Sequence, residues 1–374
     1  MNIGIITWFS GGNYGTNLQA IALQSYLRAQ GHEVKLLNFE VSVLSNNNRR
    51  DFLTRLSYQP EKYITKYFDR KNKEAISYRK FRIKETVQKY CIFTKKIESK
   101  EDYIRECNSF DLIICGSDQI WNPNWYHRYY YADYPEIKAR KISYAPSLGI
   151  NSIPEEKAKE IKMSLKGFDA ISVRESTGAR ILSNLSPVEP QVVVDPTLLL
   201  SAREWSKIAS NKVVSDQYVL SMFLTDNLRH WHAAKIFSKK KKMKHIVIPY
   251  CGISYTEGDQ LYVDAGIEDF LALIRDADYV LTDSFHVIVF CLIFNRQFVA
   301  FQRFKEDQFT SQNSRIDNLL EIATVKDRLL RYGTSKIPPM EDIDYQLVNK
   351  TLQIEIEKSK DYLLKAIGGK KIAM

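Results

Sequence analysis

The chain has 374 residues, of which 44% are apolar, 12% aromatic and 26% charged. This length and balance allow two domains with a substantial core, and they exclude a small scaffold, a largely disordered chain and, for want of an apolar run of about 18 residues, a membrane-spanning protein. The net charge is +10, and residues 46–106, with 17 Lys or Arg and 9 Asp or Glu, contribute +8 of it.

The first residues, Met1-Asn2-Ile3-Gly4-Ile5-Ile6, form a β-strand pattern and lack the features of a signal peptide. We therefore expect a cytoplasmic protein. The five cysteines are odd in number, scattered and never spaced as CxxC, so we predict buried free thiols and neither a disulfide framework nor a metal site.

Short β-rich runs alternate with helical patterns along the chain, which is typical of βαβ units and a mostly parallel sheet. Ten such runs are too many for one compact sheet, and a polar, proline-containing stretch interrupts them between Ile181 and Asp195. We therefore predict an α/β protein with two Rossmann-like domains, residues 1–185 and 186–340, and one cleft between them. The predicted strands are Ile3–Trp8, Glu33–Asn38, Leu112–Cys115, Lys141–Ala145, Ala170–Val173, Val192–Val194, Tyr218–Leu224, His245–Pro249, Tyr279–Thr282 and Phe298–Phe301.

Two segments depart from this alternation. Residues 46–106 contain no convincing strand, and their aromatic side chains recur among basic ones at roughly helical spacing, which predicts a basic helical insertion in the first domain. Residues 341–374 carry a helical apolar pattern, and we expect this C-terminal helix to pack back on the first domain.

A glycine-containing loop follows the first strand and leads into an apolar helix: Gly11-Gly12-Asn13-Tyr14-Gly15-Thr16-Asn17-Leu18-Gln19-Ala20. Glycines at such a point let backbone N–H groups approach a ligand, and a helix N-terminus favours an anion. The spacing is neither GxGxxG nor a Walker sequence. The loop is either a plain tight turn or a ligand contact, and its two asparagines favour the second.

A second polar loop, Gly116-Ser117-Asp118-Gln119-Ile120-Trp121-Asn122-Pro123, follows the predicted strand at 112–115. Ligands of open α/β sheets bind beyond the carboxyl ends of the strands. Asp118 is therefore a candidate base for a sugar hydroxyl, and Trp121 is a candidate to stack on a sugar ring. The alternative for Asp118 is a cap of the following turn.

Arg174 lies at the end of another predicted strand, in Ser172-Val173-Arg174-Glu175-Ser176. There it would project a bidentate donor into the cleft, suited to a carboxylate or phosphate. The alternative is an ion pair within the following helix, and we favour anion binding.

The last polar cluster is Thr282-Asp283-Ser284-Phe285-His286, again where a strand ends and a helix begins. A lone histidine is more often structural, but His286 at this position faces the crevice. The Ser284 hydroxyl would add an anion contact, and Arg303 and Lys305 place two cations one strand later. In the next helix start we expect Arg315 to face solvent.

Four of these segments, together with Ser143–Ser147 and Asp195–Thr197, occur in order over roughly residues 1 to 325 and resemble the polysaccharide pyruvyl transferase family. The resemblance implies a fold similar to GT-B glycosyltransferases, phosphoenolpyruvate as co-substrate with no cofactor, and a pyruvate ketal formed on a sugar of a cell-surface glycan. The matching segments are Gly11–Gln19, Gly116–Asn122, Ser143-Tyr144-Ala145-Pro146-Ser147, Ser172-Val173-Arg174-Glu175, Asp195-Pro196-Thr197 and Asp283-Ser284-Phe285-His286.

Carried onto this sequence, the resemblance makes His286 the catalytic histidine and Arg174 the arginine that holds the donor. A basic donor-site position of the family aligns with Lys305, or with Arg303 beside it. Some members carry an arginine two residues before the histidine, where this chain has Ser284. The donor side thus belongs to the second domain, and Arg303 is expected to compensate for Ser284.

The acceptor side then belongs to the first domain, where Asp118 serves as the base. We expect the acceptor sugar, lipid-linked or nucleotide-linked, to contact these residues of the two first-domain loops: Gly12, Asn13, Tyr14, Asn17 and Trp121.

Two other classes of function compete with this one. A GT-B glycosyltransferase with a nucleotide sugar would need an acidic residue for the ribose near the second-domain strand ends, where Asp283 is the obvious candidate. A non-catalytic protein would use the basic insertion to bind a membrane or nucleic acid. We expect no nucleic acid, because helical spacing of the aromatics more simply gives one packed and one solvated face. We expect the insertion to contact the anionic inner face of the membrane, with a solvated basic face as the alternative.

Overall fold

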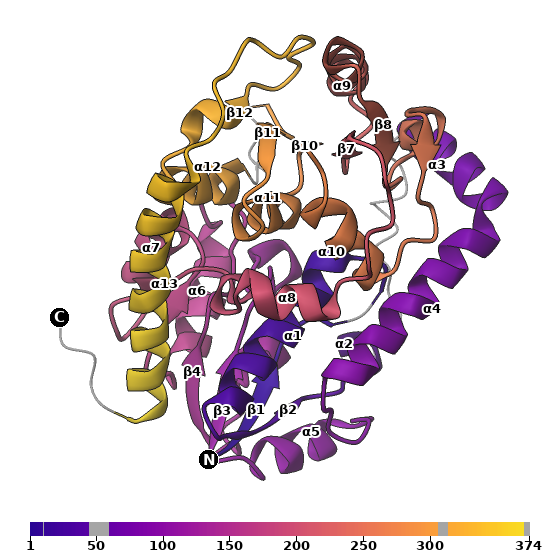
Figure 1. The fold of residues 1–374 in the computed structure, drawn as a ribbon. Helices are drawn as coiled ribbons and strands as arrows, with labels where there is room; N and C mark the ends of the chain where they lie inside the picture. Colours follow the sequence, from indigo (N-terminus) through magenta and orange to yellow (C-terminus); the bar gives the residue numbers. More distant parts are fainter. Residues whose placement is uncertain (10, 45–59, 306–312, 370–374) are drawn as a thin grey trace.

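The computed structural model describes residues 1–9, 11–44, 60–305 and 313–369, and it contains two parallel β-sheets (Figure 1). The first has the strand order β2-β1-β3-β4, and the second has the order β12-β11-β10-β7-β8-β9. A separate parallel pair joins β5 to β6. The strands are β1 Asn2–Ile6, β2 Glu33–Leu36, β3 Leu112–Cys115, β4 Arg140–Ser143, β5 Ser172–Val173, β6 Gln191–Val192, β7 Tyr218–Met222, β8 Lys244–Val247, β9 Gln260–Leu261, β10 Tyr279–Thr282, β11 Gln297–Phe301 and β12 Leu329–Leu330.

All ten predicted strands are present, at slightly different bounds. The central strands are uniformly apolar because both faces of a parallel sheet are covered, as in β3, whose four residues are all buried. The pattern missed β9 and β12, which have only two residues each and therefore no measurable periodicity.

Helices cover both sheets. Those associated in sequence with the first sheet are α1 Tyr14–Ala29, α2 Val41–Leu44, α3 Pro60–Lys71, α4 Lys73–Tyr90, α5 Lys100–Cys107, α6 Glu155–Leu165 and α7 Ser176–Ser183. Those that follow are α8 Ala202–Ile208, α9 Leu228–Lys241, α10 Ile267–Arg275, α11 Phe285–Ile293, α12 Asn313–Ile322 and α13 Tyr345–Ile367.

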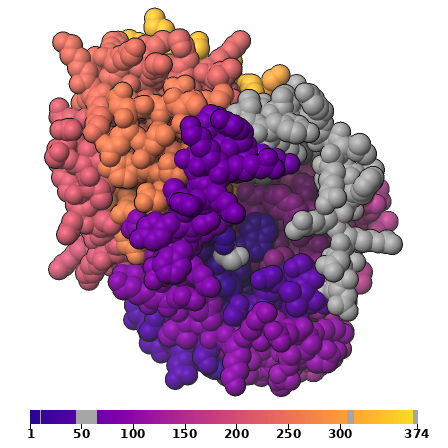
Figure 2. All heavy atoms as spheres, turned by 90° about the vertical axis from the view of Figure 1, so that its right-hand side faces the viewer, coloured from indigo at the N-terminus to yellow at the C-terminus, as the bar shows by residue number. Residues whose placement is uncertain are grey.

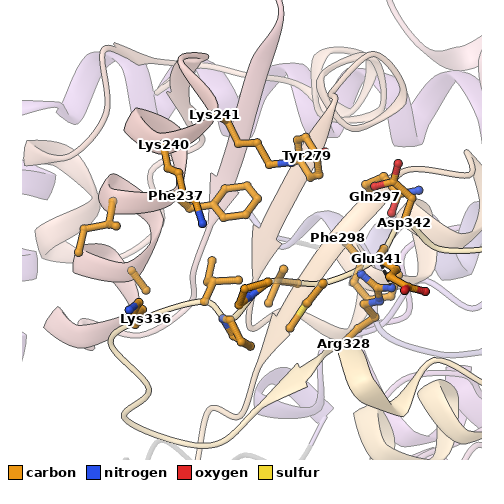
Figure 3. A pocket seen from close by; sticks show the side chains of 17 residues that line it. Phe237, Lys240, Lys241, Tyr279, Gln297, Phe298, Arg328, Lys336, Glu341 and Asp342 are labelled. Atoms are coloured by element: carbon orange, nitrogen blue, oxygen red, sulfur yellow. Dashed lines mark hydrogen bonds between the residues drawn. The ribbon is translucent and has the colours of Figure 1, made fainter.

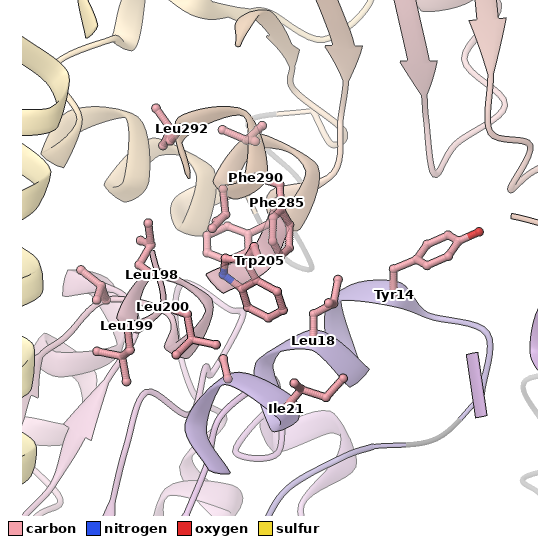
Figure 4. Close-up of a cluster of buried hydrophobic side chains, with 14 of the residues drawn as sticks. Tyr14, Leu18, Ile21, Leu198, Leu199, Leu200, Trp205, Phe285, Phe290 and Leu292 are labelled. Atoms are coloured by element: carbon pink, nitrogen blue, oxygen red, sulfur yellow. The ribbon is translucent and has the colours of Figure 1, made fainter. Parts of the chain in front are cut away.

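A continuous apolar core joins the two sheets through α1, α8 and α11 (Figure 4). Leu18 and Ile21 of α1 lie opposite a leucine run at residues 198–200, and Trp205 of α8 packs edge-on against Phe290 of α11 at 5.1 Å. The two halves therefore share buried apolar surface, which holds α1 and α11 in fixed positions relative to each other.

The basic insertion also contacts the second sheet's half of the molecule. Arg79 of α4 is buried and donates to the backbone oxygen of Pro249 at 2.7 Å, and Arg82 pairs with Asp269 of α10. Phe68 of α3 stacks on Tyr255 with centroids 5.8 Å apart. Part of the predicted solvated basic face is thus used to bridge the halves. The predicted insertion residues 46–59 lie outside the described residues.

The C-terminal helix α13 contacts both sheets. Its Tyr362 hydroxyl donates to the Ser143 oxygen of β4 at 3.1 Å, and Arg140 donates to the last carbonyl groups of the helix. Near its start, Tyr345 donates to the backbone oxygen of Arg296, just before β11. The helix therefore runs along one side of the molecule and ties the second sheet to β4 (Figure 1).

The five cysteines are all buried and reduced, as predicted. Burial raises the pKa of Cys91 to about 12, and Cys107 behaves in the same way. None of the helices in the described ranges combines the length and apolarity needed to cross a bilayer.

Candidate active site

The loop after β1 is organised by its asparagines. Asn13 is the N-cap of α1 and accepts a hydrogen bond from the Thr16 N–H at 3.3 Å. Asn17 is buried and donates to the Asn13 oxygen at 2.8 Å and, at 3.4 Å, to the oxygen of Gly11, whose φ is +81°. Gly12 is half-buried and Asn13 is exposed, so both are accessible, whereas the Asn17 amide is already bonded within the loop.

The Tyr14 side chain is buried and is not accessible to a ligand. Its ring is 2% exposed and stacks on Phe270 at 4.4 Å, and its hydroxyl donates to the Ala265 oxygen at 2.7 Å. The expectation that Tyr14 contacts an acceptor is therefore wrong for this arrangement. The residue instead fastens the start of α1 to α10, because an aromatic side chain with a polar tip suits a buried joint.

Gly15 provides the closest approach between the halves. A Cβ atom at this position would lie 1.9 Å from Nδ1 of His286. The first turn of α1 therefore accommodates the His286 imidazole only because residue 15 lacks a side chain. This contact places the predicted catalytic histidine directly against the glycine-containing loop.

The loop after β3 brings Asp118 to the same place. Its Oδ2 accepts from the Thr16 hydroxyl of α1 at 2.7 Å, and its Oδ1 accepts from the backbone N–H of Gln119 at 2.8 Å. Asp118 thus lies beside the start of α1 and does not cap the following 3₁₀ turn, whose N-cap is Asn122. The preceding Gly116 has a φ of +132°, and a Cβ there would lie 2.1 Å from the Tyr144 oxygen.

Trp121 does not reach this region. It is 1% exposed, stacks on Tyr131 at 5.0 Å and donates through its indole N–H to the Tyr130 oxygen. The prediction that Trp121 stacks on a sugar ring is therefore wrong. The turn after Asp118 directs this large apolar side chain into the core of the first half, where its burial is more favourable.

Arg174 and His286 converge on one carboxylate, that of Asp195. The Asp195 Oδ2 atom lies 3.1 Å from Nη2 of Arg174 and 3.6 Å from Nε2 of His286. The Asp195 side chain is fully buried and its Oδ1 accepts two hydrogen bonds from Thr197. Although burial by itself raises the pKa of this carboxyl group, the Arg174 guanidinium and His286 hold it well below its usual range. Asp195 is therefore ionised, and its carboxylate lies within ion-pair distance of both side chains.

Arg174 keeps donors for a further anion. Its side chain is 2% exposed, one Nη donates to the Ser117 hydroxyl, and its Nε and Nη1 atoms are buried without a hydrogen-bond partner. Buried donors are nearly always satisfied, so unsatisfied guanidinium N–H groups indicate a ligand position. The sequence alternative for Arg174 was an ion pair within the following helix. Arg174 does form an ion pair, but its partner is Asp195, which lies beyond that helix in the chain.

Two more arginines lie around the start of α11. Arg303 donates to the Asp283 backbone oxygen at 3.0 Å and has a buried Nε without a partner. The guanidinium carbons of Arg174 and Arg315 lie 5.1 and 5.7 Å from the centre of the Phe285 ring. Burial, together with Arg174 and Arg303, lowers the pKa of Arg315 to about 10, so Arg315 stays charged at neutral pH.

Arg315 was expected to face solvent, and this expectation is wrong. The residue is 6% exposed and lies on α12, whose Asn318 side chain contacts the backbone of Arg174. Sequence pattern could not find it, because a cation at a helix start is usually solvated. Asp195 was also missed as an orienting residue, although its Asp-Pro-Thr sequence is one of the six ordered motifs.

The remaining predicted donor residues differ in accessibility. Ser284 is at the N-cap position of α11, is 7% exposed, and makes no side-chain cap hydrogen bond. Lys305 is exposed at the end of a described range. Asp283 is fully buried, and its carboxylate accepts from the Leu224 N–H and the Thr225 hydroxyl. Burial raises the pKa of Asp283 despite the opposing effect of Arg303.

A cavity of about 380 Å³ adjoins the first-domain loop. Phe9, Gly11 and Asn17 line one side of it, and Lys80 and Lys84 of α4 line the other. The molecule is hollowed beside α4, with residues of the N-terminal segment at the floor (Figure 2). Gly11 and Asn17 connect this hollow to the loop that leads into α1.

The site can therefore bind a compact anion among buried arginines, with an imidazole and a carboxylate in reach of it. Within the described ranges no group of three or more His, Cys, Asp or Glu side chains has the arrangement of a metal site. Cationic side chains and a helix N-terminus are the groups that would stabilise negative charge here.

The fold is an α/β architecture of two parallel sheets, and Arg174, Asp195 and His286 converge between them. The structure of UDP-GlcNAc 2-epimerase from Methanocaldococcus jannaschii superimposes with a TM-score of 0.50 at 11% identity, covering 95% of this chain and 93% of that chain. The glycosyltransferase SnogD from Streptomyces nogalater gives a TM-score of 0.44 at 10% identity, covering 98% and 99%. At these identities the likeness concerns the fold alone, and the α/β class with its GT-B-like arrangement is confirmed.

The model of one family, polysaccharide pyruvyl transferase, matches residues 13–303. The chain belongs to this family, as its ordered motifs predicted. A search of curated protein sequences gave no match. Membership identifies the chain as a transferase that acts on polysaccharide.

Proposed function

We propose that the protein transfers the enolpyruvyl group of phosphoenolpyruvate to two hydroxyls of a sugar in a cell-surface polysaccharide precursor, forming a pyruvate ketal and releasing phosphate. The observation that carries the proposal is the set of buried arginines around His286. Arg174 and Arg303 have unsatisfied buried N–H groups, and Arg315 lies beside them. A carboxylate and a phosphate on one small molecule would satisfy such donors.

In the proposed reaction, protonation of the methylene carbon makes C2 of the donor electrophilic. His286 is our candidate for this acid, because an imidazole can donate a proton near neutral pH and the Asp195 carboxylate lies 3.6 Å from its Nε2 atom. A sugar hydroxyl adds to C2 and loses its proton, the C2–O bond to phosphate breaks, and a second hydroxyl adds with loss of another proton. The products are the ketal and inorganic phosphate.

Asp118 is our candidate base for the acceptor hydroxyl. Its Oδ2 is bonded to Thr16 of α1, the helix whose first turn also touches His286. We propose that the acceptor reaches this base from the hollow beside α4. Gly12 and Asn13 remain the accessible loop positions for an acceptor contact, and Lys80 and Lys84 add cations at the rim.

A nucleotide-sugar glycosyltransferase is the competing function. This function needs an accessible acidic side chain to bind the ribose of the nucleotide, and Asp283 was the candidate. Both carboxylate oxygens of Asp283 accept hydrogen bonds from a backbone N–H and a hydroxyl group inside the core. Because Asp283 is buried and already bonded, it does not support this alternative.

The decisive assay incubates the protein with phosphoenolpyruvate and a panel of galactosides and mannosamine derivatives. Expected are stoichiometric release of phosphate and a product heavier by about 70 Da, because ketal formation adds three carbons, two oxygens and a net two hydrogens to the sugar. Arg174→Ala should lose donor binding, whereas His286→Ala should retain binding and lose turnover. Binding of UDP-sugars with no affinity for phosphoenolpyruvate would overturn the proposal in favour of a glycosyltransferase.

We further propose that α3 and α4 bring the enzyme to the anionic inner face of the membrane, where a lipid-linked acceptor would be presented. Three aromatic side chains on these helices are exposed by 54–63% among basic residues: Tyr67, Tyr78 and Phe81. Exposed aromatic and basic side chains together favour a lipid interface.

The test is sedimentation with vesicles of phosphatidylglycerol and phosphatidylcholine. Neutralising Lys62, Lys66, Arg70 and Lys73 should abolish binding to the anionic vesicles. The matched control neutralises four exposed lysines outside the insertion, Lys138, Lys159, Lys162 and Lys166, and should leave binding unchanged. Equal binding of both variants would show that the insertion does not bind the membrane and that its basic residues are simply solvated.

A further inference from the structure

Figure 3 shows a second cavity, of about 320 Å³. It is enclosed by α9, the segment 336–342 and the strands β10 and β11. Tyr279 and Gln297, the first residues of these strands, line it, whereas the candidate active site lies beyond Thr282, the last residue of β10. The cavity therefore lies at the amino ends of these parallel strands, and the candidate active site lies at their carboxyl ends.

The body of this cavity is apolar. Phe237 of α9, Phe298 of β11 and the segment Ile337–Met340 supply most of its wall. Small-molecule sites usually begin at about 300 Å³ and combine an apolar wall with a few placed polar groups. The size fits a molecule of one or two rings.

The polar groups at one end are lysines. Lys240 and Lys241 come from the last turn of α9, and Lys336 comes from the facing segment. Lys241 is held in place, because its Nζ lies 2.7 Å from the Tyr279 hydroxyl and 4.2 Å from the centre of the Tyr279 ring. Of the four-lysine run at 239–242, only the middle two line the cavity.

The acidic residues near the cavity leave these ammonium groups uncompensated. Figure 3 shows Glu341 and Asp342 at the end away from Lys240 and Lys241. Arg328 lies on their side, where it donates to the Glu341 backbone oxygen and pairs with Asp327 at 3.0 Å. Lys240 and Lys336 have no carboxylate within ion-pair distance in the described part of the chain.

We propose that this cavity is a binding site for a small molecule with an apolar ring system and one anionic group, such as a carboxylate, sulfonate or phosphate. The ring system packs between Phe237, Phe298 and Met340, and the anion contacts Lys240, Lys241 and Lys336. This site is separate from the proposed pyruvyl transfer and does not depend on it.

The position of the site connects it to the arrangement of the two halves. The segment 336–342 leads directly into α13, which contacts both sheets. The Gln297 side chain accepts from the Ile343 N–H at 2.8 Å and so attaches this segment to β11. An occupant therefore packs against the chain segment that anchors α13.

The test uses two fluorescent probes, the anionic 8-anilinonaphthalene-1-sulfonate and the neutral N-phenyl-1-naphthylamine, titrated into the full-length protein. Lys240→Gln/Lys241→Gln should weaken binding of the anionic probe at one site by roughly tenfold and leave the neutral probe unaffected. Lys235→Gln/Lys239→Gln makes the same charge change on α9 outside the cavity and should change neither. Ala233→Phe, which fills the cavity, should remove one site for both probes.

Circular dichroism and thermal unfolding identify any variant that fails to fold, so that only folded variants are compared. Unchanged stoichiometry for both probes in folded Ala233→Phe would show that the cavity is not a binding site. Equal weakening by the two double-lysine variants would show that the anion is attracted by the general charge of α9 rather than bound in the cavity. Either result overturns the proposal, and the phosphoenolpyruvate assay is independent of both.

Discussion

Substitution of Gly15 by alanine tests whether the His286 imidazole must occupy its observed position. The added Cβ would lie 1.9 Å from Nδ1 and 2.2 Å from Cγ of the ring. Real Cβ contacts are essentially never closer than 3.0 Å, so the ring has to move by about 1 Å or more. It cannot move without changing its 3.6 Å approach to Asp195.

A displacement of this size at a reacting group costs about a hundredfold in rate, which corresponds to about 2.7 kcal/mol of activation free energy. We therefore expect Gly15→Ala to lower kcat in the phosphate-release assay by roughly a hundredfold while donor binding, which depends on the arginines, is retained. Gly368→Ala, where the nearest atom would be 3.4 Å from the new Cβ, makes the same change at the end of α13 and should have no effect.

A double-mutant cycle separates this mechanism from general damage. In the His286→Ala background the ring that would clash is absent, so adding Gly15→Ala should cost nothing further. Activity of Gly15→Ala within about twofold of the unmodified protein, or additive losses in the double variant, would refute the reasoning that His286 acts from this position.

Two further predictions concern buried charges, and a third concerns the buried thiols. Arg174→Met removes the guanidinium beside Asp195 and should lower the free energy of unfolding by about 3–5 kcal/mol at pH 7. Because Arg174 and His286 together outweigh burial and depress the pKa of Asp195, the normal protein loses this stability as pH falls below about 4. The variant should show a weaker loss in urea titrations between about pH 5 and pH 2. Arg315→Gln should raise the KM for the donor roughly tenfold and abolish the rise in KM that we expect as pH increases toward about 10, where Arg315 loses its charge; an unchanged alkaline limb would contradict its role. The five thiols should react with a disulfide reagent only after unfolding, and fast labelling of the native protein would contradict their burial.

The strands were predictable because their signal is local. Runs such as Leu112–Cys115 are apolar throughout, because a parallel strand that is covered on both faces needs apolar residues on both faces. The ends of these strands were predictable for the same reason, so Asp118, Arg174 and His286 were placed correctly at carboxyl ends. Asp118, Arg174, Asp195 and His286 then meet there, joined by contacts to α1 and to one another.

The errors concern side-chain direction and long-range partners. Trp121 and Tyr14 occur in loops that follow strands, but Trp121 packs into the first half's core and Tyr14 against α10, because burying their large rings outweighs exposure at a ligand site. Arg315 looked solvent-facing because its local sequence gives no sign of Arg174, which is distant in the chain.

The sequence by itself determined the α/β alternation, the polar strand ends and the family, because each depends on residues that are neighbours in the chain or recur in a fixed order. Only the tertiary structure decided that Asp195 joins Arg174 to His286, that Gly15 makes room for the imidazole, and that the basic insertion bridges both halves through Arg79 and Arg82. These contacts join residues far apart in the chain. Their energies come from burial and charge pairing, which exist only after the two sheets pack against one core.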